Sequence, residues 1–447
     1  MNGAALAGQA WLGMLAMGAL AMYCIAVAAV VRYPGLGLAL TAVIPAIIWE
    51  SPQAPRVAGV LGFTIYLDDV IVLVLAGALA VAATRGRLVP RSFHVATALL
   101  LLAFVGSFLA GAVGGDLGTV VVEARGFVAV PIALLWAASI RYQDGKALGW
   151  LMRRYATWVV VGLIVIAIYH GARYGLGGAD ALLISDSGEV VQTGRILTSG
   201  QALILGISAL ALLTPGDVPS SRWTRVVACL GLATLVLSQQ RTATVAIVAG
   251  LVVIFVRLGA KQRATAIASA SVGALTLAIA YAAGSLGSLP EQLVQSATSS
   301  GTYEGRTASW SALVSDAFSR GASVVMFGRP FGSGFGRFEG NGRWVEFSPH
   351  NWYVSVFLRA GLIGLILLFW LLVAALRLAL RAGVAPWLPG AWVAVTVFGW
   401  AYSWPWYVLP LLVCGLAAPF VSDHLGSSRT ASTYRKLPGS RRLVGSH

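Results

Sequence analysis

Charged side chains are scarce in this chain: Asp, Glu, Lys and Arg together account for 11% of the 447 residues, whereas 58% are hydrophobic. The mean hydropathy of +0.82 is far above that of soluble proteins of this length. This composition excludes a soluble globular fold. Apolar stretches of about 15 to 25 residues recur between short charged or Pro- and Gly-containing loops, which predicts an all-α, polytopic bundle of transmembrane helices.

Cysteine and histidine are also rare, with three and five residues. Cys24, Cys229 and Cys414 lie inside apolar stretches without neighbouring ligand residues. We interpret them as packing residues rather than as a metal or redox centre. The sequence therefore predicts neither a metal nor another cofactor.

The apolar stretches define about thirteen candidate spans, or about twelve if one early segment is misassigned. The first of them follows no basic leader, so we interpret it as a retained helix rather than a removed signal peptide. The side of the N-terminus depends on this count. The candidate spans are 11–31, 35–49, 69–83, 94–112, 119–140, 156–170, 198–213, 226–237, 245–256, 264–283, 351–376, 391–403 and 405–420.

In a soluble protein, the net charge of +15 would suggest nucleic acid binding. In a membrane protein, the distribution of Lys and Arg between the two sides instead indicates how the chain is oriented in the membrane. Most Lys and Arg residues fall in alternate loops and in the C-terminal tail, 422–447. The positive-inside rule places these loops and the tail in the cytoplasm. We expect the tail to contact anionic membrane lipid and not nucleic acid.

Two loops on the outer side are longer than a connection requires. The chain divides into transmembrane helices over 1–283, which include the outer loop 171–199, a large extracytoplasmic loop over 284–349, C-terminal transmembrane helices over 350–421 and the basic tail. Long ordered loops in compact proteins usually carry function. We therefore expect the chemistry on the outer face.

The large loop contains the segment "GRTASWSALVSDAFSRG", whose apolar residues recur with helical spacing and predict an amphipathic helix. Arg306 lies on the same stripe, so the helix would aim a guanidinium towards the protein from its first turn. Because the positive end of the helix dipole opposes a cation there, an anion on the buried side would stabilise it. The apolar stripe consists of Trp310, Leu313, Val314, Ala317 and Phe318.

A glycine-rich stretch, "GRPFGSGFGRF", follows this helix. Gly332, Gly334 and Gly336 allow the backbone to turn sharply or to approach another group closely. The stretch lacks the lysine and the strand-to-helix context of a P-loop. We favour a plain turn over a phosphate cradle, which stays open as the alternative.

The segment "SPHNWYVSVFLRAGLIG" predicts the start of a transmembrane helix. Ser348 suits the N-cap and Pro349 the first helical position, which places His350 in the first turn at the outer membrane face. The helix dipole disfavours imidazolium there, and a neutral imidazole is what a general base needs. Gly361 and Gly364 would share the face of the histidine and pack against a neighbouring helix. An ordinary hydrogen-bonded histidine at a helix end is the alternative.

A polar break interrupts an otherwise apolar stretch at "LSQQRTATV". Arg241 stands there among Ser, Gln and Thr donors and acceptors with no acidic neighbour, which suits a lipid diphosphate or an anionic sugar better than a salt bridge. An arginine that merely reaches to the lipid headgroups is the alternative. Arg195, in "GRILTSGQ", is a weaker instance of the same pattern.

Adjacent carboxylates at Asp68 and Asp69, in "YLDDV", could hold a divalent metal in an outer loop. Acids at a helix N-terminus also interact favourably with the helix dipole, and no further acid nearby would complete a coordination shell. We therefore favour capping. Glu304, Glu339 and Glu346 are possible partners or substitute bases.

Four motifs occur in order along the chain and on one side of the membrane. They are "SQQRTA" around Arg241, the pair Arg306 and Trp310, the "PFGSGFGRF" turn, and His350 and Asn351 followed, after nine residues, by Gly361 and Gly364. The set resembles the O-antigen ligase and O-antigen polymerase family of bacterial polytopic membrane glycosyltransferases. The likeness extends over residues 195–364 in motifs and over the whole chain in hydropathy.

The resemblance implies a metal-independent, inverting glycosyltransferase that moves a glycan from undecaprenyl diphosphate to an acceptor hydroxyl. It also implies that the reaction takes place on the periplasmic face of the bacterial cytoplasmic membrane. No cofactor would be needed, because the lipid diphosphate is already an activated leaving group. His350 would be the catalytic base. The diphosphate and the substrates would be bound by Arg241, Arg306, Arg195, Asn351 and Gln240.

Two positions depart from the family pattern: Arg359 stands where a glutamate is frequent, and no Asn-Pro-Asn follows Arg195. The motifs concern the donor, so the acceptor stays open. We place a ligase that acts on the lipid A core first, with a polymerase that extends an undecaprenyl-linked chain, or transfer to a protein hydroxyl, as alternatives. Outside the family, a transporter or flippase would need midplane ionisable residues and paired broken helices, and a scaffold would need none of these side chains.

Overall fold

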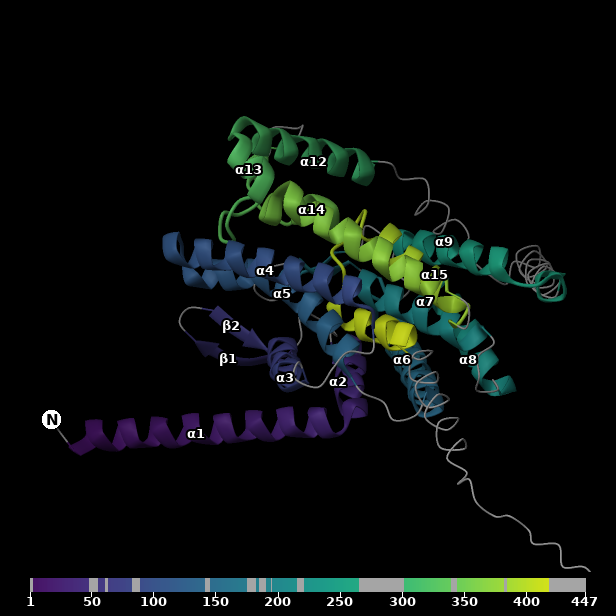
Figure 1. Ribbon diagram of the computed structural model, residues 1–447, viewed down its shortest axis with the longest axis horizontal. Coiled ribbons are helices and arrows are strands. Elements are labelled where there is room, and N and C mark those ends of the chain that lie inside the picture. The colour runs from purple at the N-terminus through teal and green to yellow at the C-terminus, as the bar shows by residue number, and fades with distance from the viewer. Residues whose placement is uncertain are drawn as a thin grey trace, which may run out of the picture.

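Helices make up most of the described chain, which confirms an all-α fold (Figure 1). The computed structural model describes residues 3–47, 55–60, 63–82, 89–140, 145–174, 182–184, 190–193, 195–214, 221–264, 301–338, 344–381 and 384–417. The predicted span 264–283 beyond its first residue, the loop segment 284–300, Glu339, the side chain of Glu304 and the tail 422–447 lie outside this part.

The described elements follow one another as helices with three short antiparallel hairpins between them. The helices are α1 (Gly3–Arg32), α2 (Pro34–Ile47), α3 (Leu67–Ala82), α4 (Arg91–Gly114), α5 (Leu117–Ser139), α6 (Gly145–Tyr174), α7 (Ser199–Leu213), α8 (Arg222–Leu237), α9 (Arg241–Arg257), α12 (Gly301–Ser319), α13 (Ala322–Phe327), α14 (Trp352–Ala379), α15 (Trp387–Phe398) and a C-terminal helix (Trp406–Ala417). The hairpins pair β1 (Arg56–Val60) with β2 (Phe63–Tyr66), β3 (Leu182–Ile184) with β4 (Val190–Thr193), and β5 (Arg337–Phe338) with β6 (Trp344–Val345).

By length and composition, four of the described helices could cross a membrane: α4, α5, most of α6, and α14, whose 28 residues include a break in the helical backbone. α1 and α2 are bent by 111° at the break between them and could together form a fifth span. Other predicted spans form helices shorter than the ~20 residues that cross a bilayer, such as α7 with 15 residues and α15 with 12. The total of about twelve or thirteen spans stays a prediction.

α14 is not a straight helix. Gly361 has φ +63° and ψ −161°, in a region that favours glycine, and it interrupts the helical backbone. Tyr353 and Phe369 stack with ring centroids 5.8 Å apart, although residues sixteen apart in a straight helix would be separated by about 24 Å. The chain therefore folds back at Gly361 into a first arm, 352–360, and a second arm, 362–379.

Small residues allow the two arms of α14 to pack closely. A Cβ atom on Gly364 would meet the Ala360 side chain and would lie 3.3 Å from Cγ1 of Val356, eight residues before it. The expectation that His350, Gly361 and Gly364 share one helical face is therefore wrong. Gly361 forms the break and packs against a neighbouring helix, α13, whereas Gly364 packs against the first arm of its own helix.

α9 and α15 cross antiparallel at a pair of glycines. A Cβ atom on Gly250 would lie 2.6 Å from the carbonyl oxygen of Gly390, so the two backbones approach closely. Gly250 also faces Ala394, whereas Gly390 faces Ile254, so the sequence numbers run in opposite directions along the contact. The start of α9 and the end of α15 therefore lie at the same end of the bundle, which we call the site end.

α12 and α13 lie over α14 (Figure 1). The prediction of an amphipathic helix is confirmed, since Trp310, Leu313 and Ala317 of α12 are buried. Leu313 and Ala317 pack against Phe357 of the first arm of α14. Phe318, which was predicted on the same stripe, is 61% exposed, although its ring lies 6.1 Å from that of Phe357.

The end of α13 covers the break in α14. A Cβ atom on Gly361 would meet the backbone of Met326, and one on Gly328 would lie 2.6 Å from the amide nitrogen of Ala360. The amide of Arg329 donates to the carbonyl oxygen of Leu358 at 2.7 Å. In an unbroken helix that carbonyl would accept from the residue four positions later, so the loop after α13 takes the place of the missing helical turn.

Candidate functional site

A turn between α15 and the C-terminal helix, residues 399–405, receives contacts from several segments at the site end. The amide of Trp352, at the start of α14, donates to the carbonyl oxygen of Gly399 at 2.8 Å. A Cβ atom on Gly200, at the start of α7, would lie 3.5 Å from Cβ of Pro405. We call residues 399–405 the site turn. Short helices on either side of it allow distant parts of the sequence to meet here.

His350 lies just before α14 and not in its first turn. The helix begins two residues later, and the Asn351 side chain accepts a hydrogen bond from the amide of Val354 at 3.1 Å as the N-cap. The prediction that Ser348 caps the helix and Pro349 begins it is therefore wrong, because asparagine is an equally good cap and stands closer to the helix. Asn351 was predicted to bind substrate, but it is 1% exposed and serves as the cap.

Two aromatic rings contact His350, and a third aromatic side chain holds the backbone directly before it. Its φ is +50°, which is uncommon for residues other than glycine. Trp310 Nε1 donates to the carbonyl oxygen of Pro349 at 2.6 Å and so fixes the backbone directly before the histidine. The imidazole lies 5.7 Å from the Phe347 ring and 6.0 Å from the Tyr402 ring, measured between centroids. The remaining side of the residue is exposed.

Arg306 and His350 meet at Tyr402. The Arg306 guanidinium lies 5.1 Å from the centroid of the Tyr402 ring, and its Nη2 donates to the Tyr402 hydroxyl at 3.4 Å. Its Nη1 donates to the carbonyl oxygen of Ala401 at 3.4 Å. The inward orientation predicted for Arg306 is thus confirmed. A half-buried cation and an imidazole share one aromatic ring.

The imidazole of His350 is neutral at physiological pH. Although one side of the residue is exposed, removal of water from the ring, followed by the positive charges of Arg306 and Arg337, lowers the pKa of His350 to about 4. The sequence predicted a neutral ring from the helix dipole, whereas the structure attributes it to burial and neighbouring cations. A ring nitrogen is therefore available to accept a proton.

Arg337 in β5 is a buried cation that the sequence analysis missed. Its Nη1 donates to the carbonyl oxygens of Phe335 and Phe347 at 2.9 and 2.8 Å, and its guanidinium lies 4.7 Å from the centroid of the Phe347 ring. Its Nε donates to the Ser309 hydroxyl. Arg337 thus holds Phe347, which in turn contacts His350. The position of Arg337 directly after an apolar, glycine-rich turn was the sequence feature that could have indicated a buried arginine.

A second polar group at the site end contains Arg195, Gln240 and Arg241. Arg195 Nη1 donates to Gln240 Oε1 at 3.2 Å, and Gln240 Nε2 donates to the carbonyl oxygen of Leu197 at 2.7 Å. Arg241 is the first residue of α9, so the antiparallel packing of α9 and α15 places it at the same end as the site turn. The structure therefore brings Arg195 to the polar break, as a shared binding role requires.

Asp68 and Asp69 lie at the start of α3. Asp69 Oδ2 accepts a hydrogen bond from the amide of Tyr66 at 2.9 Å, which is one half of a capping box. Asp69 also pairs with Nη1 of Arg125 at 3.5 Å. These contacts agree with capping, the interpretation favoured from the sequence. Across the described ranges, no group of three or more His, Cys, Asp or Glu side chains could hold a metal ion.

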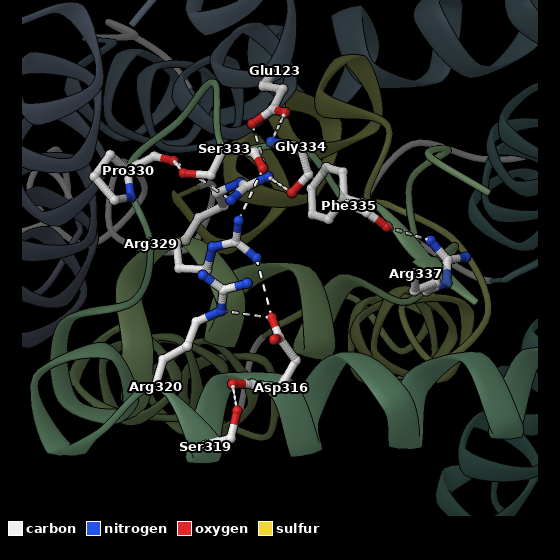
Figure 2. A network of polar contacts seen from close by, with 11 residues as sticks. Glu123, Asp316, Ser319, Arg320, Arg329, Pro330, Ser333, Gly334, Phe335 and Arg337 are labelled. Atoms are coloured by element: carbon white, nitrogen blue, oxygen red, sulfur yellow. Dashed lines mark hydrogen bonds and ion pairs between the residues drawn. The ribbon is translucent and has the colours of Figure 1, made fainter. Parts of the chain in front are cut away.

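A third polar cluster surrounds the glycine-rich turn (Figure 2). The amides of Gly332 and Gly334, both with positive φ, donate to the two carboxylate oxygens of Glu123 at 2.9 and 2.8 Å. Arg359 Nη2 pairs with the same carboxylate at 2.8 Å. The turn is thus an anion cradle that a carboxylate of the chain itself occupies. Arg359, at the position that departs from the family pattern, makes a contact between two helices.

The site end combines a neutral imidazole with cationic groups. His350 and Arg306 share an aromatic ring, and Arg195 is hydrogen-bonded beside the start of α9. Such a set can accept a proton from a hydroxyl and bind an anion. Comparison with known proteins adds no assignment, since neither a protein-family model nor a curated protein matches this chain.

Proposed function

We propose that this chain is a metal-independent, inverting glycosyltransferase that moves a glycan from undecaprenyl diphosphate to an acceptor hydroxyl. The observation that carries the proposal is the meeting of His350 and Arg306 at Tyr402. A neutral base beside a cation suits a reaction in which a hydroxyl loses its proton while an anionic group departs. The lipid diphosphate donor is inferred from the motif resemblance.

The proposed reaction uses these groups as follows. His350 accepts the proton of the acceptor hydroxyl while the hydroxyl oxygen forms a bond to the anomeric carbon. The bond between that carbon and the diphosphate oxygen breaks, and its electron pair stays on the departing undecaprenyl diphosphate. Arg306, together with Arg241 and Arg195, stabilises the charge on the diphosphate. Attack from the side opposite the leaving group inverts the anomeric centre.

The low pKa of His350 links donor binding to catalysis. Without an anion nearby, loss of water around the ring, together with the cations, keeps the ring neutral but makes it a weak base. A bound diphosphate would offset the charge of Arg306 and raise the pKa of His350 towards its ordinary value. The base would therefore become stronger once the donor is in place.

The acceptor and the membrane orientation complete the proposal. The motifs concern the donor and do not distinguish the acceptors. We place a ligase that acts on the lipid A core first and a polymerase second, because about twelve predicted spans with one dominant loop directly before His350 suit a ligase. The site end would face the periplasm, since Arg257 and Arg377 lie in the last turns of α9 and α14 and the positive-inside rule places such residues in the cytoplasm. The C-terminus would then be cytoplasmic.

Reconstituted protein supplied with labelled undecaprenyl-linked glycan and a panel of acceptors tests the proposal. We expect His350→Ala and Arg306→Ala to lose most of the transfer activity while keeping the thermal unfolding midpoint. Arg320→Ala is the matched control, because this exposed arginine directly after α12 pairs with Asp316 at 2.9 Å and has no part in the proposed reaction. Near-normal transfer by both arginine and histidine variants, combined with loss of activity on chelation, would contradict the proposal.

A transporter of anionic lipids is the second candidate, and two broken helices favour it. α1 and α2 meet at a bend of 111°, and α14 turns back at Gly361. Interrupted helices are common at transport sites. A transporter should continue to move labelled lipid across vesicles in the His350→Ala variant, whereas an enzyme should stop. Lipid movement without any transfer product would support the transporter.

A further inference from the structure

Glu123 and Arg359 connect three parts of the molecule that are distant in sequence. Glu123 belongs to α5, Arg359 to the first arm of α14, and the glycine-rich turn follows α13. Arg359 Nη2 also donates to the carbonyl oxygen of Gly334 at 2.7 Å, and its guanidinium lies 4.2 Å from the centroid of the Phe335 ring. The carboxylate, the guanidinium and the turn thus hold one another in place.

Both charges of this pair are shielded from water. The Arg359 side chain is 1% exposed and that of Glu123 is 11% exposed. A buried charge that loses its partner is strongly destabilised, so each of the two residues requires the other. Arg359 stands two residues before Gly361, so the pair fixes α14 at the point where the helix turns back.

A continuous series of contacts leads from this pair to His350. Phe335 lies under the Arg359 guanidinium, and its carbonyl oxygen accepts a hydrogen bond from Arg337. Arg337 also donates to the carbonyl oxygen of Phe347, whose ring contacts the imidazole. A second route runs along the first arm of α14, which begins directly after the histidine and its neighbouring cap.

We propose that Glu123 and Arg359 are positioning residues for His350. By fixing the turn 332–334 and the first arm of α14, they hold Arg337 and Phe347 against the imidazole. Neither residue touches the substrate in this proposal. As far as activity is concerned, the proposal rests on the proposed function of His350, whereas the environment of the imidazole can be measured without any substrate.

The geometry of the pair predicts that its two charges cannot be exchanged. The carboxylate of Glu123 accepts hydrogen bonds from two backbone amides, and the guanidinium of Arg359 donates to a backbone carbonyl. In the double variant Glu123→Arg/Arg359→Glu, a cation would face amide donors and a carboxylate would face a carbonyl oxygen. A simple ion pair requires only opposite charges and would tolerate the exchange.

The experiment compares the full-length protein in lipid nanodiscs with Glu123→Gln, Glu123→Asp and the exchanged double variant. Arg320→Ala is the matched control, because it removes an exposed arginine of the same network that pairs with Asp316 at 2.9 Å. Amide hydrogen exchange over residues 329–338 reports on the turn. Histidine NMR, assigned with a His350→Gln variant, reports the pKa of His350, and steady-state transfer gives kcat and KM for the donor.

The charged and titratable groups that face His350 are Arg306 from α12, Arg337 from β5 and Tyr402 from the site turn. In Glu123→Gln and in the exchanged variant, we expect faster amide exchange in the turn and a pKa of His350 that rises from about 4 towards 6.5. We expect kcat to fall on the order of 100-fold with little change in KM, because the base is misplaced while donor binding persists. Glu123→Asp should retain most of the activity, and Arg320→Ala should match wild type.

A folded Glu123→Gln variant with an unchanged pKa of His350, or full recovery in the exchanged variant, would overturn the positioning role. If Glu123→Gln does not fold, the apolar double variant Glu123→Leu/Arg359→Met decides by the same readouts, because it removes the pair without leaving a buried charge: a shifted pKa of His350 supports the proposal and an unchanged one contradicts it. Transfer activity in His350→Ala would instead refute the proposed function. The amide hydrogen exchange and the histidine NMR results would then still decide whether Glu123 and Arg359 position the imidazole.

Discussion

Arg359 in α14 and Arg306 in α12 have different environments. Arg359 is 1% exposed and pairs with the carboxylate of Glu123. Arg306 is half-buried and contacts an aromatic ring, a hydroxyl and a carbonyl oxygen, and no carboxylate in the described part of the chain pairs with it. A buried cation with a carboxylate is satisfied inside the protein, whereas a partly exposed cation with neutral partners can bind an external anion. Burial and the charge of the partner therefore distinguish Arg359 from Arg306, the arginine that we propose binds the donor.

The largest effect should follow removal of the carboxylate that balances Arg359. Glu123→Leu leaves a buried guanidinium without a counter-charge, so we expect the free energy of unfolding to fall by ~3–5 kcal/mol. The double variant Glu123→Leu/Arg359→Met should recover most of this loss, because apolar replacement of a buried pair is often neutral. Denaturant or thermal unfolding in detergent measures both. Equal losses in the single and double variants would show that the charge is not the cause.

Removal of Arg306 should have the opposite profile. Arg306→Ala should lower the transfer rate by ~10²–10³-fold, as loss of one group that stabilises developing charge does. The unfolding midpoint should stay close to that of wild type, because the contacts that the guanidinium makes with described residues are with neutral groups. Arg306→Lys should recover part of the rate, since it keeps the charge without the planar fork. A stability loss as large as that of Glu123→Leu would erase the distinction between the two arginines.

A third, smaller effect concerns the break that carries Arg359. Gly361→Ala places a Cβ atom against the backbone of Met326 at a positive φ, so we expect a loss of ~1–3 kcal/mol in unfolding free energy. Gly126→Ala is the matched control, because Gly126 lies in α5 with open space around it. Alanine there should be neutral or slightly stabilising. Comparable losses in both variants would argue against a strained break at Gly361.

Local periodicity explains what the sequence could predict. The buried stripe of α12 and the inward position of Arg306 follow from helical spacing alone, and the structure agrees with both. Asp68 and Asp69 were assigned to helix capping because the signals for the start of a helix also lie within a few neighbouring residues. These features need no information from distant parts of the chain.

Features that depend on distant segments could not be predicted. Gly361 stands in an apolar run that is typical of a continuous helix, and only the backbone of α13 packed against it reveals the break. Ser348 and Asn351 are equally suitable caps, and contacts from Trp310 and the site turn decide between them. Glu123 carried no motif, because its partners lie in the glycine-rich turn and in α14.

The smallest effect concerns pH and sharpens the comparison of the two arginines. In the proposed reaction the active form of His350 is the neutral imidazole, so the part of kcat/KM that depends on it should be lost as pH falls through the pKa of about 4. Because Arg306 helps to lower that pKa, Arg306→Gln should move the acid side of the pH profile upwards by less than about one unit. Single-turnover assays make the slow variant measurable, and Arg320→Ala, which removes a cation paired with Asp316, should leave the profile in place. An unchanged profile in Arg306→Gln would mean that burial and Arg337 alone keep the imidazole neutral, and Arg306 would then act on the donor without acting on the base.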